Sequence, residues 1–239
     1  FDPLHKRMSG KLEVGYWKIR GLAAPLRMLC VYAGADWENK EYEVMGEPGN
    51  WDRSAWFDVK PALKEKNPLM NLPYVKEGDR VVTQSNACMA MLGRRFNLNG
   101  STEEEIASND QVLCEVFDLR NKAVMFFYSA PEAFAAAAPT YLATYANVHL
   151  AKLEAYLKHV GKKFASADTP LTADFHLFEM LDQHIVFGKS RGVEALADFP
   201  TLAAYHKRFL ELDQLKSYFE GPMHALPLNN KSASFGGTA

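Results

Sequence analysis

The chain has 239 residues and a mass of 26.8 kDa, which is enough for one large domain or two modest ones. Its 27 Lys and Arg residues against 29 Asp and Glu residues give a net charge of −2, so no overall positive field exists to attract nucleic acid, and no such partner is expected. Hydrophobic residues make up 48% of the chain, as in a folded soluble protein, yet no window approaches ~20 consecutive apolar residues, so no membrane span is expected.

The first part of the chain alternates strand-like and helix-like patterns. Residues 1–10 precede the first of these patterns, and we interpret them as a tag remnant or a disordered N-terminus. The predicted strands cover residues 11–17, 38–44, 74–76 and 81–83. The predicted helices cover residues 22–33, 52–63 and 85–96, with a loop at 45–50 and Ser85 as the last helix's N-cap. This βαβαββα order predicts an α/β domain over residues 11–96.

Beyond Gly100 the strand signal largely disappears. Ser101 with Glu104, and Thr102 with Glu105, have the capping-box spacing that marks a helix start. The predicted helices cover residues 101–127, 140–159, 173–187, 191–197 and 201–212. The alanine run at 135–138 is interpreted as a loop or a single turn between two prolines. An all-helical domain with a C-terminal tail is therefore expected over residues 97–239.

The sequence lacks the motifs of several common enzyme classes. It contains no CxxC, HExxH, GxSxG, Walker or GxGxxG motif, and its seven His residues are scattered, so no metal site is expected. The acidic run Glu103–Glu105 is interpreted as first-turn carboxylates that complement a helix dipole. The cysteines, Cys30, Cys88 and Cys114, are odd in number and widely spaced, which favours free thiols and a cytoplasmic location.

Polar and aromatic residues mark strand ends and helix starts in the first domain. They are Tyr16 at the end of the first strand, the loop residues Trp51, Arg53, Trp56 and Lys60, the segment Asn71–Pro73, and Gln84 with Ser85. Strand ends and helix N-termini are where α/β sheets hold small ligands, and a helix N-terminus favours an anion. A small acidic ligand is therefore expected.

Four short motifs follow one another in the chain, namely Gly15–Ala23 (GYWKIRGLA), Asp52–Trp56 (DRSAW), Asn71–Tyr74 (NLPY) and Thr83–Ala87 (TQSNA). In order and spacing they resemble the cytosolic glutathione transferases, and the mu class in particular. The likeness extends from about Leu12 to Leu228. It implies a thioredoxin-like domain followed by a helical domain, usually in a homodimer, which agrees with the architecture predicted above. It also implies conjugation of glutathione, as co-substrate, to hydrophobic electrophiles in detoxification.

The resemblance implies a role for each residue of a glutathione site. Tyr16 would donate a hydrogen bond to the glutathione sulfur. Trp56 and Lys60 would bind the glycine carboxylate end, with Trp17 and Arg53 nearby. Asn71 and Leu72 would meet the cysteinyl backbone beside a cis Pro73, and Gln84 and Ser85 would receive the γ-glutamyl carboxylate. Asp118 would reach the γ-glutamyl amine across the dimer. The alternatives are an ordinary N-cap for Ser85 and a solvated helix carboxylate for Asp118.

An electrophile pocket is implied on the helical side. Tyr128 would assist addition to epoxides and enones as a hydrogen-bond donor. The expected lining residues are Ile19, Leu22, Phe117, Arg120, Val124 and Tyr128, although helix-core packing is an equal alternative for Phe117 and Val124.

The chain also departs from the mu pattern in several places. Leu69 and Met70 stand where an aromatic dimer key is usual, and Ala90 replaces an interface arginine, so the dimer packing is expected to differ. Leu171 stands at the first position of a Ser/Thr-x-x-Asp cap, so Thr172 or Thr169 is expected to cap instead.

Two of these departures affect the sites. The stretch from Lys60 to Asn71 is two residues longer than usual, and the C-terminal tail diverges from Leu228 onward. The acceptor preference therefore cannot be carried over from the mu class.

Other functions remain open on the sequence alone. A glutathione-dependent isomerase, such as a prostaglandin synthase, would use the same thiolate. A carrier that kept the fold without turnover is a second alternative, although loss of Tyr16 would be expected for it. A cysteine-based thiol transferase is disfavoured because residues 15–27 contain no cysteine.

Overall fold

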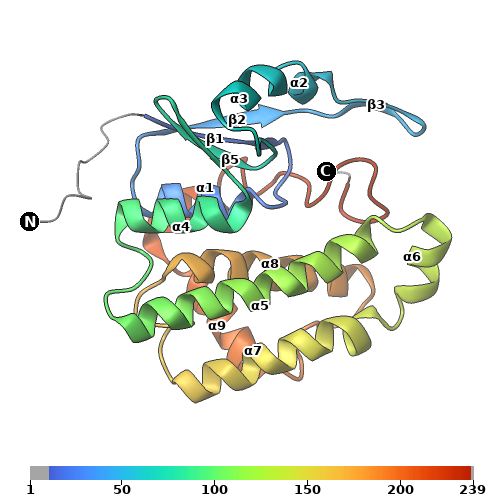
Figure 1. Ribbon diagram of the computed structural model, residues 1–239. Coiled ribbons are helices and arrows are strands. Elements are labelled where there is room, and N and C mark those ends of the chain that lie inside the picture. Colours follow the sequence, from blue (N-terminus) through green and yellow to red (C-terminus); the bar gives the residue numbers. More distant parts are fainter. Residues whose placement is uncertain (1–10, 238–239) are drawn as a thin grey trace, which may run out of the picture.

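The computed structural model describes residues 11–237 and has two parts, an α/β part above and a helical part below in Figure 1. The residues interpreted as a tag remnant, 1–10, lie outside the described part. The sheet order is β2-β1-β5-β6, with β1 (Leu12–Trp17) parallel to β2 (Trp37–Tyr42) and antiparallel to β5 (Tyr74–Glu77), which pairs with β6 (Arg80–Thr83). The predicted thioredoxin-like arrangement is confirmed.

Helices cover both faces of this sheet. Figure 1 shows α1 (Ala24–Tyr32) and α4 (Ser85–Phe96) between the sheet and the helical part, and α2 (Ser54–Phe57) and α3 (Lys60–Lys66) on the other side. The single helix predicted over 52–63 is therefore wrong, because the chain forms two helices. Pro61, which lacks an N–H, stands in the first turn of α3, where it starts a new helix and cannot continue an old one.

Two further expectations for the α/β part need correction. Residues 45–50, expected as a loop, belong to a small antiparallel hairpin of β3 (Met45–Glu47) and β4 (Asn50–Asp52). Ser85 is not the N-cap of α4. That position belongs to Gln84, at φ 73°, and Ser85 is the buried first residue of the helix.

The second part contains the predicted helices with one exception. Its elements are α5 (Glu103–Phe127), α6 (Pro131–Ala137), a π-helical turn η1 (Leu142–Ala146), α7 (Asn147–Val160), α8 (Thr172–Ser190), α9 (Pro200–Leu210), a 3-10 turn η2 (Asp213–Leu215) and α10 (Lys216–Phe219). No helix forms over 191–197, where the chain turns at Gly192 with φ 69°. The alanine run continues α6, so the loop expected there is also wrong. Among the described residues, no helix is long and apolar enough to cross a membrane.

The helix starts show which capping interactions form. Thr102 Oγ1 accepts a hydrogen bond from Glu105 N, and the Glu105 carboxylate accepts from Ser101 N and Oγ. At α8 the Asp174 carboxylate accepts from Leu171 N at 2.8 Å. Neither Thr172 nor Thr169 caps this helix, because the Thr172 hydroxyl is instead engaged with Asn99 and Asn109.

A buried ion cluster joins the two parts. Arg20, in the loop after β1, donates to Glu179 at 2.8 Å and to Asp182 at 2.6 Å, and both carboxylates belong to α8. His206 Nε2 of α9 lies 3.1 Å from Asp182, and His224 Nε2 lies 3.5 Å from it. Because the loop that carries Arg20 also follows Tyr16 directly, this cluster fixes the end of β1 against the helical part.

Candidate active site

Tyr16 lies at the junction of the two parts. Its side chain is only 6% exposed and packs with Ile19 and Ala23 in a small apolar cluster that Trp17, Leu22 and Leu72 border. Burial raises the pKa of the Tyr16 hydroxyl, while the charge of Arg120 and a hydrogen bond from the Leu22 N–H act in the opposite direction. The hydroxyl is therefore protonated at neutral pH and suited to donate a hydrogen bond.

The close approach of the following loop to Tyr16 depends on Gly21. A Cβ at this position would lie 2.7 Å from Tyr16 Cε1 and 3.1 Å from its hydroxyl, and the backbone has φ 39°. Only glycine meets both conditions without strain. The glycine of the GLA sequence after Arg20 therefore allows the loop to pack against Tyr16.

Arg27 holds the loop from the other side, and sequence reasoning missed it. Its buried guanidinium donates to Ile19 O at 2.6 Å, to Trp17 O at 3.3 Å and to Asn39 Oδ1 at 2.9 Å. These bonds satisfy the carbonyl oxygens of Trp17, the last residue of β1, and of Ile19 in the loop after it. The signal was available in the sequence, since Arg27 interrupts the apolar stripe of the helix that begins near Leu22.

Trp56 and Lys60 come together although they belong to different short helices. Trp56 is buried in a cluster with Tyr42, at 5.2 Å between ring centroids, and Tyr74, at 6.1 Å. Lys60 Nζ lies 5.8 Å from the Trp56 ring. Arg53 precedes α2 with an exposed side chain. This region therefore presents cations beside a rigid aromatic support.

Thr83 connects two predicted ligand-binding segments. Its hydroxyl donates to Asn71 O at 2.7 Å and lies 3.1 Å from Pro73 O, and it accepts from Asn71 N at 3.2 Å. The Leu72–Pro73 peptide is cis, and the register between β1 and β5 starts only at Tyr74. Since Gln84 and Ser85 follow Thr83 directly, the structure brings the Asn71–Pro73 segment and the start of α4 to one edge.

One face of α5 carries the predicted electrophile-pocket residues. Phe117, Arg120 and Val124 are half-buried at helical spacing, and Tyr128 follows at the C-cap, 37% exposed. The Phe117 ring lies 6.5 Å from that of His176, so it also packs within the helical part. Burial and the charge of Arg120 lower the pKa of His176 to about 3, so this imidazole is neutral.

The C-terminal segment Ala225–Gly237 closes this side. In Figure 1 it runs between the two parts. Arg20 N and Gly21 N donate to Pro227 O and Leu228 O, and Asn230 N donates to the Tyr128 hydroxyl at 2.8 Å. A cavity of about 470 Å³ lies here, lined by residues that include Ile19, Val44 and Asn230. Sequence reasoning missed Asn230 because a backbone N–H leaves no signature in the sequence.

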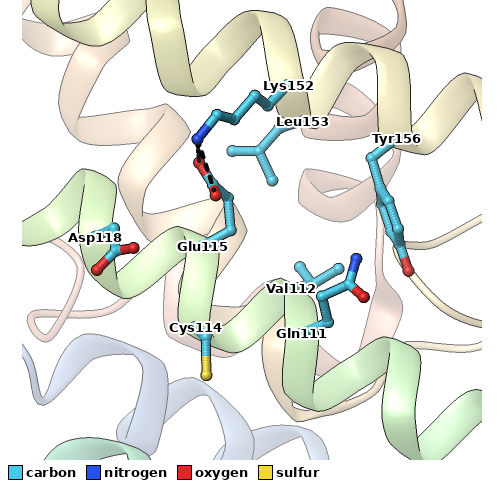
Figure 2. Close-up of a pocket in the computed structure, with 8 residues that line it drawn as sticks. All are labelled: Gln111, Val112, Cys114, Glu115, Asp118, Lys152, Leu153 and Tyr156. Atoms are coloured by element: carbon cyan, nitrogen blue, oxygen red, sulfur yellow. Dashed lines mark hydrogen bonds and ion pairs between the residues drawn. The ribbon is translucent and has the colours of Figure 1, made fainter.

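Asp118 lies on a different face of α5. Figure 2 shows it at a groove of about 370 Å³ between α5 and α7, with Gln111 and Glu115 of the same helix. Lys152 reaches across the groove to Glu115 at 3.4 Å. Asp118 is exposed, so within one chain it does not join the Tyr16 site. Leu69 is also exposed, whereas Met70 is buried and Ala90 half-buried.

The side chains outside this site that could bind a metal or act as a thiolate are the His, Asp, Glu and Cys residues. Among residues 11–237, no three His, Cys, Asp or Glu side chains form a group that could hold a metal ion. Burial raises the pKa of both the Cys30 and Cys88 thiols to about 12, so neither is a thiolate at neutral pH. Cys114 is exposed at the groove between α5 and α7.

The fold and the tyrosine site together define a two-domain protein of the glutathione transferase type. Family models described as the N-terminal and C-terminal domains of glutathione S-transferase match residues 12–93 and 117–222. The Homo sapiens protein named Glutathione S-transferase Mu 3 is 34% identical over 95% of this chain and 96% of its own. The Mus musculus protein named Glutathione S-transferase Mu 6 is 36% identical over 87% of this chain and 90% of its own.

Solved structures of glutathione S-transferases have the same fold as this chain. The glutathione S-transferase Blo t 8 superposes with a TM-score of 0.81 at 28% identity, over 94% of this chain and 99% of its own. A Pi-class glutathione S-transferase of Onchocerca volvulus gives 0.77 at 28% identity, over 93% and 99%. The chain belongs to the glutathione S-transferase family, and it is an enzyme that conjugates glutathione. These findings do not favour the isomerase or carrier alternatives.

Proposed function

We propose that Tyr16 makes the thiol of bound glutathione nucleophilic by donating a hydrogen bond to the thiolate. The observation that carries this proposal is the buried, protonated hydroxyl at the end of β1, beside Leu72 and the charge of Arg120. A free thiol with a pKa of ~8.5 is only a few per cent ionised at pH 7. Lowering that pKa by about 2 units would make most of the bound sulfur an attacking anion.

The remaining glutathione contacts follow the edge of the α/β domain. Lys60, with Trp56 behind it and Trp17 and Arg53 nearby, binds the glycine carboxylate. Asn71 and Leu72, next to Pro73, meet the cysteinyl backbone. The Thr83 hydroxyl already bonds to the N–H and C=O of Asn71, so the backbone pairing falls to Leu72, which the register between β1 and β5 leaves out. Gln84 and Ser85 at the start of α4 receive the γ-glutamyl carboxylate, which the positive end of the helix favours.

The acceptor occupies the space between the β1–α1 loop and α5. Ile19 and Leu22 form one wall, and Phe117, Arg120, Val124 and Tyr128 form the other. Tyr128 can donate to an oxygen on the acceptor while its own oxygen accepts from Asn230 N. This arrangement supports addition to epoxides and enones, in which negative charge develops on oxygen.

The functional unit is a cytoplasmic homodimer of mu-class type, without a metal, and each chain has an α/β domain over 11–96 and a helical domain over 97–239. The similarity to several Mu glutathione S-transferases supports the class, and Asp118, exposed on a different face of α5, supports the dimer. In the dimer Asp118 reaches the γ-glutamyl amine of the neighbouring chain's ligand. Leu69, 74% exposed, is the apolar side chain available for the contact that an aromatic residue usually makes.

Binding and turnover, sedimentation, and a variant of Asp118 test the proposal. The protein should be retained on immobilised glutathione and should conjugate glutathione to 1-chloro-2,4-dinitrobenzene, and retention without turnover would favour a carrier. Sedimentation should give a dimer at micromolar concentration. Asp118→Asn should weaken glutathione binding more than Asp110→Asn, which removes an exposed carboxylate from the same helix. A fully active monomer would exclude the shared site.

A further inference from the structure

Arg120 is a partly buried cation without an acidic partner. Within residues 11–237 its guanidinium donates to Asn121 Oδ1 on the next residue, at 3.2 Å, and no carboxylate forms an ion pair with it. The arginines nearer the sheet differ, since Arg20 pairs with Glu179 and Asp182, and Arg27 with Glu41. Burial lowers the pKa of Arg120, as expected for a cation that has lost water without gaining an anion.

This unpaired charge lies near the reacting centre. The charge of Arg120 acts to lower the pKa of both the Tyr16 and the Tyr128 hydroxyls, so the guanidinium lies close to both of them. Helical spacing places Arg120 two turns before Tyr128 on the same face of α5. Any acceptor that approaches a sulfur at Tyr16 therefore has the guanidinium as a neighbour.

The cavity along the C-terminal segment also carries an excess of positive charge. Its charged lining residues are Lys18, Lys231 and Glu43. Lys18 and Glu43 pair with each other at 2.9 Å. Lys231 adds a further positive charge next to Asn230, whose N–H binds the Tyr128 hydroxyl. The surface on this side of Tyr128 therefore favours the approach of an anion.

We propose that Arg120 makes this enzyme prefer acceptors that carry a carboxylate, or a comparable planar anion, on the electrophilic group. This inference rests on the proposed acceptor pocket and names its substrate class. A guanidinium presents several N–H donors in one plane, which matches the two oxygens of a carboxylate. An acceptor of this kind restores a partner to the buried cation, whereas a neutral acceptor leaves that cation unpaired.

A matched pair of aryl chlorides tests the preference. In 4-chloro-3-nitrobenzoate and 4-chloro-3-nitrobenzamide the same reaction occurs, because the sulfur–carbon bond forms, the carbon–chlorine bond breaks, chloride leaves and the thiol proton passes to solvent. The carboxylate and the carboxamide differ mainly in charge. Arg120→Met should lower the ratio of kcat/KM for the benzoate over the benzamide by roughly 10- to 150-fold, the range of a hydrogen-bonded charge pair. Intrinsic reactivity cancels in this comparison of ratios.

Two control variants make the result specific. Arg120→Lys keeps the charge and should retain part of the preference. Lys122→Met removes one exposed cation from the same helix and should leave the ratio unchanged. An equal fall for both acceptors in Arg120→Met would overturn the inference, because Arg120 would then act on the thiolate or on folding. If the unchanged protein conjugates the benzamide normally but shows no Arg120-dependent benzoate preference, the proposed pocket stands and only this inference fails.

A binding measurement on the unchanged protein gives a result independent of any variant. The unreactive analogues 3-nitrobenzoate and 3-nitrobenzamide should both inhibit competitively with respect to the aryl chloride. The benzoate should bind about tenfold more tightly at low ionic strength, and added salt should reduce the difference. Equal or tighter binding of the benzamide would contradict the proposal. If neither analogue competed, the proposed acceptor pocket would be wrong as well.

Discussion

The thiol side and the acceptor side of the site are built in different ways. Every predicted glutathione contact within one chain lies between Tyr16 and Ser85, on a single sheet and the helices around it. The acceptor side combines the loop after β1, one face of α5 and the segment Ala225–Gly237, which are more than 90 residues apart along the chain. A ligand that never changes can be held by a local arrangement of strand ends. A pocket for varied acceptors is assembled from distant segments, each of which can change without disturbing the sheet.

The largest effect is expected when the ion cluster that joins the α/β part to the helical part is removed. Arg20→Met removes the cation between Glu179 and Asp182 and leaves two buried carboxylates without it. The free energy of unfolding should fall by about 3–5 kcal/mol. Urea unfolding at one fixed protein concentration measures it. The control Arg94→Met removes an exposed arginine and should change it by less than about 0.5 kcal/mol. A loss below about 1 kcal/mol in Arg20→Met would show that the cluster does not hold the two parts together.

Tyr16→Phe should impair activation of the thiol and leave the acceptor side unchanged. The variant loses one hydrogen bond to an anion, worth ~1.5–3 kcal/mol, so conjugation should slow by roughly 10- to 150-fold near neutral pH while glutathione affinity barely changes. The defect should shrink toward pH 9, because above ~8.5 the free thiol ionises by itself. Turnover and thiolate absorbance from pH 6 to 9 measure this. Tyr145→Phe, an exposed tyrosine on η1, is the control. Undiminished turnover with an unshifted titration in Tyr16→Phe would assign sulfur activation to another group.

The helical part, which supports the acceptor side, should lose stability at acid pH because a histidine on α8 is buried. His184 is buried between Met180 O, at 2.6 Å, and the Tyr141 hydroxyl, at 3.1 Å, and burial lowers its pKa to about 4. In the unfolded chain the imidazole has a pKa of ~6.5, so below that pH the unfolded state binds a proton that the folded state does not. His184 should therefore remove about 2 kcal/mol of stability between pH 7 and pH 5.

Urea unfolding at both pH values checks this contribution. In His184→Gln the fall in stability on acidification should be smaller by that amount, whereas His159→Gln, an exposed histidine, should behave like the parent. Identical pH dependences of His184→Gln and the parent would mean that the ring is protonated in the folded state.

The smallest effect concerns one hydroxyl on the acceptor side. Tyr128→Phe should lower addition to an epoxide or enone by roughly 2- to 12-fold relative to aromatic substitution, because a neutral hydrogen bond contributes ~0.5–1.5 kcal/mol and only addition develops charge on an oxygen in reach. Both reactions are measured on the same preparation, so each serves as the control for the other. Equal effects on the two would remove Tyr128 from the chemistry.

The elements of the thiol side were largely predictable from the sequence because their signals are local, whereas the roles of its residues rest on the family resemblance. The strand that carries Tyr16, the hairpin that ends at Thr83 and the helix that follows all have their own periodicity. The hairpin of β3 and β4 was missed because Met45, Gly46 and Glu47 are all exposed and show no apolar alternation. The break between α2 and α3 was also missed, because the residues around Asp58, where α2 ends, show no change of pattern that would mark it.

The acceptor side was harder to predict because its decisive contacts involve no local pattern. The same holds outside the site for the helix expected over 191–197, because that segment instead passes over Gly188, where a Cβ would lie 2.5 Å from Val193 O. The hydrogen bond from Asn230 N to Tyr128 joins residues 102 positions apart. That no carboxylate of residues 11–237 pairs with Arg120 is a property of its three-dimensional surroundings, which no residue spacing reveals.

The hydrogen bonds of the segment Ala225–Gly237 also set an order of events during protein synthesis. A ribosome makes Tyr16, the sheet and α5 well before this segment, and the nascent chain can fold its α/β part early. The contacts from Arg20 N, Gly21 N and Asn230 N form only after the segment has left the exit tunnel. A growing chain therefore completes the acceptor side last, because its closing contacts wait for the final residues of the described segment.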